Sequence, residues 1–208
     1  MMSKLSGTIN LITFEELNKH LLEDIAPSGY FNSLDKELDI YPLNLLKKLK
    51  NVEQSKKYHP EGNVWNHTMM VVDEAAKVKD QSSHSKAFMW AALLHDIGKP
   101  DTTKVRKGRI TSYDHDELGA KISKEFLEEY TNDEDFIKKV CLMVKYHMHM
   151  LYVLKGLPFG NPRQMVKDVD IHDIALLCRC DRLGRIGVDK EAEIKNYKEF
   201  LDKLKTLV

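Results

Sequence analysis

LLHDIGKP (residues 93–100) ends an apolar run with an adjacent histidine and aspartate. In a helix, His95 lies on the same side as Ala91 and Phe88, four and seven residues earlier, so its ring points toward the core. Asp96 follows at the edge of the core, where a carboxylate without a partner is costly. The stretch therefore predicts a buried helix that brings two metal-ligand side chains to the interior.

Working outward, we find five helical patterns that each place a histidine or aspartate beside an apolar stripe. The helices are expected over residues 64–79, 85–95, 116–130, 134–147 and 171–181. Their ligand-type side chains are His67, His95, His115, His147 and Asp181. One histidine on such a face is usually an ordinary core residue, but several that converge with buried carboxylates need a cation. Imidazole with carboxylate suits Zn, Mn, Fe, Ni or Co, and the absence of thiolate from the set argues against structural zinc.

The other patterns are also helical, so the expected fold is an all-α, single-domain helical bundle. Thr13 caps a first helix and stands in capping-box relation to Glu16. Further helices are expected over residues 43–49 and 190–207, and a small hairpin or extended arm over residues 104–113. Strand-type alternation is scarce elsewhere, which favours helices as the framework of the core.

Composition limits the classes of function. The 208 residues include 32 Lys plus Arg and 32 Asp plus Glu, and this zero net charge argues against a general nucleic-acid binder. No apolar run reaches about 18 residues, so no transmembrane helix is expected, and the first residues lack the pattern of a signal peptide. The 3 cysteines do not form a disulfide framework, which favours a reduced, cytoplasmic setting.

The segment around His95 and Asp96 resembles the signature of the HD superfamily of metal-dependent phosphohydrolases. In that pattern His67 is the upstream histidine and Asp181 the late aspartate. The resemblance implies that these residues bind a metal ion in an HD-type helical bundle.

Two further histidines, His115 and His147, match the extra ligands of superfamily members that hold two ions. In such members the aspartate of the HD pair bridges the ions, so Asp96 is expected to bridge here. His149 would replace His147 if its helix ends early. The implied cofactor is one or two divalent metal ions, with Ni, Mn, Co, Fe, Zn and Mg all left open.

The resemblance is closer still to the HD domain appended to bacterial CCA-adding tRNA nucleotidyltransferases. It is carried by HPEGNVWNHTMMVVDEA, HDIGKPDTT, GRITSYDHDELGA and CDRLGR. It divides the chain into an N-terminal helical extension (1–58), an HD core (59–186) and a C-terminal helix (187–208). Asn63 departs from the pattern, which often has Asp there. The Gly-Gly-Ser and paired aspartates of the nucleotidyltransferase head are not found, so nucleotide addition is not expected.

This resemblance implies a phosphomonoesterase or phosphodiesterase that uses metal-bound hydroxide. The implied partner is a small phosphorylated substrate, a nucleotide or 2′,3′-cyclic nucleotide, or an RNA end, and not a membrane. Two alternatives stay open. One is a dinuclear-iron oxygenase of the HD type built on the same six residues, and the other is a non-catalytic regulatory module that binds metal or nucleotide.

Asp96, Lys99 and Asp116 are the candidate catalytic residues. Lys99 could neutralise a phosphate, while Asp116 could carry a proton or simply favour a helix N-terminus. Lys99 is also a candidate for substrate contact, and the others are Arg182, Arg185, His59 and Glu61. Charged residues near helix ends are more often simply solvated. The basic stretch over residues 104–109 could guide a polyanion toward the site.

Overall fold

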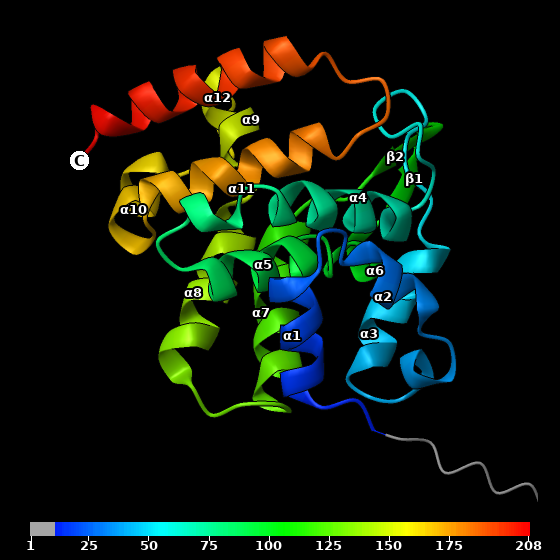
Figure 1. Cartoon of the computed structure of the whole chain (residues 1–208). Coiled ribbons are helices and arrows are strands. Elements are labelled where there is room, and N and C mark those ends of the chain that lie inside the picture. The colour runs from blue at the N-terminus through cyan, green and yellow to red at the C-terminus, as the bar shows by residue number, and fades with distance from the viewer. Residues whose placement is uncertain (1–10) are drawn as a thin grey trace, which may run out of the picture.

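The computed structural model describes residues 11–208 and is built mainly of helices (Figure 1). Its central helices are α4 (Val64–Ala76), α5 (Ser85–Leu94), α7 (His115–Glu128), α8 (Glu134–Tyr146) and α11 (Ile171–Leu183). The strands β1 (Lys104–Arg106) and β2 (Arg109–Thr111) form a small antiparallel hairpin. The all-α class and the hairpin are therefore confirmed. Our interpretation of the first ten residues lies outside the described part of the chain.

Helix α5 lies at the centre because it is apolar on every side. Its residues from Ala87 to Leu94 are all buried. A helix without a polar face must be covered all round, and α4, α8, α11 and α1 (Phe14–Glu23) pack against it. The residues that follow α5 are consequently carried into the interior, where His95 and Asp96 are each 1% exposed.

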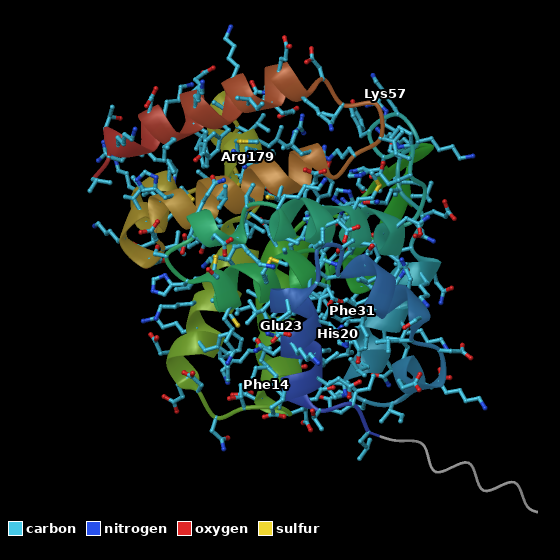
Figure 2. The ribbon with its side chains drawn as sticks, viewed as in Figure 1. Phe14, His20, Glu23, Phe31, Lys57 and Arg179 are labelled. Atoms are coloured by element: carbon cyan, nitrogen blue, oxygen red, sulfur yellow. The ribbon has the colours of Figure 1, made fainter. Side chains whose placement is uncertain are left out.

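The N-terminal elements pack on the same core from one side. α1 begins after Thr13, whose hydroxyl oxygen accepts from the Glu16 backbone N–H at 3.2 Å. The reciprocal half of the capping box is absent, because the Glu16 carboxylate accepts from the Tyr30 hydroxyl. The following elements are α2 (Ser28–Ser33), η1 (Lys36–Asp39), α3 (Leu43–Lys47) and η2 (Lys48–Asn51). Both α2 and η2 pack on α4, and Phe31 of α2, labelled in Figure 2, is fully buried.

The C-terminal helix α12 (Lys190–Lys205) packs along α11, and Figure 1 shows the two side by side. The guanidinium of Arg182 on α11 donates to the Glu193 carboxylate on α12 at 2.8 Å. The remaining helices are η3 (Lys79–Gln81), α6 (Lys99–Thr102), α9 (His149–Lys155) and α10 (Pro162–Asp168). In the part of the chain that the structure describes, no helix is both long and apolar enough to cross a membrane.

One helix end that differs from expectation, and one helix that the sequence did not predict, matter for the site. Helix α8 ends at Tyr146, so His147 is its C-cap rather than its last helical residue. A separate helix, α9, then begins at His149. The chain turns between them, which gives His147 and His149 different surroundings.

Candidate metal centre

Side chains from four separate segments converge on the carboxylate of Asp96. His95 Nε2 lies 3.2 Å from Asp96 Oδ2, and His67 Nε2 lies 4.0 Å from the same oxygen. His115 Nε2 and His147 Nε2 lie 3.4 Å and 3.8 Å from Asp96 Oδ1. Each carboxylate oxygen therefore faces a different pair of imidazoles. We call the two halves the His67 side and the His147 side.

All four imidazoles are held from behind by backbone carbonyls. The Nδ1 acceptors are the carbonyls of Gly184 for His67 (3.2 Å), Ala92 for His95 (2.9 Å), Ser112 for His115 (2.7 Å) and Val144 for His147 (2.6 Å). A carbonyl can only accept, so in the neutral form of each ring, which is the form that binds metal, the hydrogen lies on Nδ1 and the lone pair on Nε2. Four lone pairs consequently point at one carboxylate, which is the second-shell arrangement typical of metal-ligating histidines.

The residues present fit a divalent ion. His95 Nε2 and Asp96 Oδ2 are buried polar atoms without an aligned hydrogen bond. His115 Nε2 and His147 Nε2 lie only 3.2 Å apart. Two nitrogens bound to one ion at about 2.0–2.1 Å would be about 3.0–3.4 Å apart. The donor set can therefore accommodate a cation without rearrangement of this pair.

The His67 side carries additional charged groups. Asp181 Oδ1 lies 3.0 Å from His67 Nε2, and Glu61 Oε1 lies 3.0 Å from His67 Nδ1. One guanidinium nitrogen of Arg185 donates to both oxygens of Asp181, at 2.9 and 3.1 Å. The Glu61 oxygen that faces His67 also accepts from His59 Nδ1 at 2.8 Å. His67 is thus held between two carboxylates, each of which has a second partner.

Burial and charge act against each other in this cluster. Burial alone raises the pKa of Asp96, but Lys99 and His95 outweigh it and hold the pKa well below its usual value. Asp181 behaves alike: burial raises its pKa, and Arg185 and His67 bring it well below the usual value. Both carboxylates are therefore ionised acceptors for a cation.

Lys99 lies directly against the HD pair. Its Nζ is 2.7 Å from Asp96 Oδ2 and donates to Gln54 Oε1 at 2.7 Å, and its side chain is 11% exposed. Lys99 therefore adds a positive charge at the partly accessible edge of the cluster. The sequence analysis did not identify Gln54 as a site residue, because nothing near it in the chain indicates a contact with a residue 45 positions away.

Two residues expected to contact substrate have other partners. Glu61 has a side chain only 1% exposed and bonds His67, so it supports a ligand-type histidine instead. Arg182 turns to Glu193 on α12. Adjacent residues on a helix face different ways, whereas residues four apart share a face. Arg182, next to Asp181 on α11, therefore turns away from the cluster, whereas Arg185 lies past the end of α11 and bonds Asp181 from the following turn.

Asp116 and His149 lie beyond the cluster around Asp96. Asp116 is buried, and its carboxylate accepts from the Tyr152 hydroxyl at 3.5 Å. His149 Nε2 accepts from the Asn161 backbone N–H at 3.2 Å. His147 is therefore the histidine that faces the HD carboxylate.

Close backbone approach sets the position of the second pair of histidines. A Cβ at Gly98 would lie 2.2 Å from the His115 carbonyl oxygen and 2.6 Å from the Gly119 nitrogen. Only a glycine lets the HD segment come this near to α7. This contact brings His115 to within hydrogen-bond range of Asp96.

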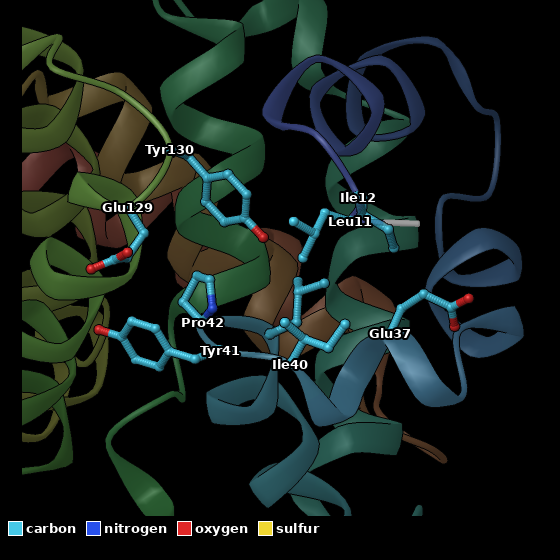
Figure 3. Close-up of a pocket in the computed structure, with 9 residues that line it drawn as sticks. Leu11, Ile12, Glu37, Ile40, Tyr41, Pro42, Glu129 and Tyr130 are labelled. Atoms are coloured by element: carbon cyan, nitrogen blue, oxygen red, sulfur yellow. The ribbon is translucent and has the colours of Figure 1, made fainter. Parts of the chain in front are cut away.

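A hollow elsewhere on the surface is distinct from this cluster. Figure 3 shows a pocket lined by Leu11, Ile40, Tyr41, Glu129 and Tyr130 among others, and its volume is about 250 Å³. It contains none of the side chains around Asp96. Because none of those side chains lines it, we assign this pocket no part in the metal chemistry.

The family model for the HD domain matches residues 64–183. Among curated proteins, the multifunctional CCA protein of Psychromonas ingrahamii is 30% identical over 205 residues, covering 89% of this chain and 46% of that protein. The one of Actinobacillus pleuropneumoniae serotype 5b is 28% identical over 149 residues (68% and 36%), and that of Laribacter hongkongensis is 27% identical over 199 residues (91% and 47%). The chain thus spans less than half the length of these relatives. Because the family model covers more than half of the chain, the protein belongs to the HD domain family, a superfamily of metal-dependent phosphohydrolases.

Proposed function

We propose that this protein is a metal-dependent phosphohydrolase that acts on phosphate esters of nucleotides or on RNA ends. One observation carries the proposal: four imidazole Nε2 atoms surround the two oxygens of Asp96, and each ring is held by a backbone carbonyl. Lys99 compensates one oxygen of this buried carboxylate, but the four ring nitrogens that face Asp96 still lack a cation, and imidazole with carboxylate is a ligand set that suits a divalent metal ion. The resemblance to multifunctional CCA proteins supports nucleotides or RNA ends as substrates.

In this proposal the six ligands are divided between two ions. His67, His95 and Asp181 would hold one ion, His115 and His147 would hold the other, and Asp96 would be shared by both. When bound, the ions supply a hydroxide nucleophile near neutral pH and neutralise charge on the phosphate.

The cationic side chains have separate roles. Lys99 Nζ already contacts Asp96 and is the nearest ammonium for a phosphate oxygen at the cluster. Arg185 holds the Asp181 carboxylate through two hydrogen bonds and so orients a ligand. Lys99 is thus expected to affect turnover, and Arg185 to affect metal binding.

The test combines elemental analysis with a phosphate-release panel of 2′,3′-cyclic nucleotides, nucleoside mono- and triphosphates and an aryl phosphate. Asp96→Ala should remove metal and reduce turnover to background, whereas Lys99→Ala should weaken turnover and leave the metal bound. The matched control is Asp202→Ala, at an exposed position of α12.

Full activity of Asp96→Ala would overturn the mechanism. Two bound irons with a visible charge-transfer band, and no phosphate release from any ester, would favour oxygenation instead. A loaded metal centre with neither activity would favour a regulatory module.

A further inference from the structure

The hairpin β1–β2 concentrates positive charge on one exposed arm. Its cationic residues Lys104, Arg106, Lys107 and Arg109 are all exposed. Within residues 11–208, none of them forms an ion pair with a carboxylate. Four unpaired cations within six residues leave this arm strongly positive, although the whole chain has zero net charge.

The strand register increases the repulsion within the hairpin. Arg106 lies directly opposite Arg109 in the antiparallel pair, and like charges at such positions are destabilising. Lys107, at the turn, has a backbone φ of 49°, which residues other than glycine rarely adopt. An anion bound to the hairpin would relieve the repulsion.

A second basic segment lies in the turn after Gln54. Lys56, Lys57 and Tyr58 are exposed there, with Tyr58 60% exposed. Lys57 Nζ lies 5.3 Å from the Tyr58 ring centroid. This turn repeats the combination of cation and aromatic ring found at the hairpin, where the Arg106 guanidinium lies 5.2 Å from the ring of Tyr113.

Both segments start beside the metal centre. Gln54 accepts from Lys99 Nζ, and α6, which begins at Lys99, packs on η2 and leads into β1. One basic segment therefore follows Gln54 in the chain and the other follows Lys99, and these two residues are joined by a hydrogen bond beside Asp96. In the one view that Figures 1 and 2 share, Lys57 and the hairpin both lie toward the right-hand edge of the molecule.

We infer that these two segments form a docking surface for single-stranded RNA, which we call the basic hairpin surface. It comprises Lys56, Lys57, Tyr58, Lys104, Arg106, Lys107, Arg109 and Tyr113. The cations suit phosphates, and the two exposed tyrosines (60% and 58%) offer ring faces for unpaired bases. That the docked strand is also cleaved or trimmed at its end rests on the proposed function, but binding does not.

The test measures binding to the full chain, stripped of metal with a chelator so that the probe is not hydrolysed. The probe is a fluorescein-labelled 12-nucleotide single-stranded RNA, and anisotropy is recorded over a series of salt concentrations. The surface variant is the triple Lys57→Ala, Lys107→Ala and Arg109→Ala. The matched control is the triple Lys19→Ala, Lys138→Ala and Lys195→Ala, which removes equal charge from exposed positions on α1, α8 and α12.

The surface variant should bind at least 10-fold more weakly, and its salt slope should fall by about 2, since each single-strand phosphate contact contributes about 0.7. The control should bind like the wild type. Tyr58→Leu with Tyr113→Leu should weaken binding about 10-fold while the salt slope stays the same, because stacking is not ionic.

Equal weakening by both triples would overturn the inference, because net charge alone would then explain binding. Capture of vesicles with 30% phosphatidylserine but not of RNA would also overturn it, in favour of a membrane surface. Phosphate release from a mononucleotide by the metal-loaded protein tests the proposed function separately. Failure of RNA binding would leave the proposed phosphohydrolase function standing, and failure of phosphate release would leave the docking surface standing.

Discussion

The two sides of Asp96 differ in how much negative charge surrounds their histidines. On the His67 side, carboxylates of Asp181 and Glu61 lie 3.0 Å from the two ring nitrogens. Burial alone lowers the pKa of His67, but these two hydrogen bonds outweigh it and raise the pKa above its usual value. On the His147 side, burial lowers the pKa of both histidines, and that of His147 falls to about 4.

This difference implies unequal ion sites. Asp181 gives the His67 side a carboxylate ligand that the His147 side lacks, so the His67 side should bind its ion more tightly at neutral pH, even though Arg185 and Lys99 offset part of its negative charge. Protons compete with metal there, because the pKa of His67 is raised. The His147 side should bind more weakly, but its histidines stay neutral to lower pH.

The largest effect is expected from Asp96→Asn, which touches both sides. In the two-ion centre proposed above, the substitution removes the charge that both sides share, so the metal content should fall from two ions per chain to none. Plasma mass spectrometry of the purified protein measures this. Retention of one ion would show that Asp96 belongs to one side only.

Substitutions on one side should each remove one ion. Asp181→Asn should empty the His67 side, and His147→Gln should empty the His147 side, leaving one ion in both cases. With Mn²⁺ bound, the spin coupling of the pair should disappear from the electron paramagnetic resonance spectrum of both variants. If either variant kept a coupled pair, the division into two sides would be wrong.

Glu61→Gln should lower the affinity of the His67 side for its ion about 10–100-fold, as found for other carboxylates that orient a ligating histidine. The ion of the His147 side should bind as before, since Glu61 does not contact its histidines. Calorimetric titration of the metal-free protein gives both affinities, and Glu191→Gln at the exposed start of α12 is the control. Equal weakening of both ions would mean that Glu61 only supports the fold.

The smallest effect is a difference in protonation in the metal-free protein. At pH 5.5, His67 should be protonated and His147 neutral, which nuclear magnetic resonance of the imidazoles can record. Because the folded pKa of His147 is lowered to about 4, it stabilises the fold above pH 6.5 and loses this contribution as pH falls toward 4. His67 has the opposite sign: its contribution is present below pH 6.5 and is lost as pH rises through its raised pKa. A protonated His147 at pH 5.5 would contradict the comparison.

Local sequence was sufficient for the longer helices and for most of the side chains around Asp96, but it did not predict the short helices α2, α6, α9 and α10. Apolar spacing predicted the helices that became α4, α5, α7, α8 and α11, and the hairpin near residues 104–113 is also present. The same spacing brought His67 and His95 to the inner faces of their helices. Three of the four Nδ1 acceptors lie three residues before their histidine, so even the ring orientation is largely local.

The contacts between distant segments could be identified only from the tertiary structure. Glu61 and Arg182 looked alike as charged residues near the motif, yet one bonds His67 and the other bonds α12. Lys99 and Gln54 meet across 45 residues, and His67 and the Gly184 carbonyl across 117.

The sequence by itself determined which residues could bind metal and which helices carry or precede them, because helical periodicity depends only on neighbouring turns of the same helix. Only the tertiary structure decided which oxygen of Asp96 each histidine faces. That choice depends on how closely whole helices approach, as at Gly98, where a single added carbon would push His115 away. Packing distances of this kind are set by the complete core and not by any one segment.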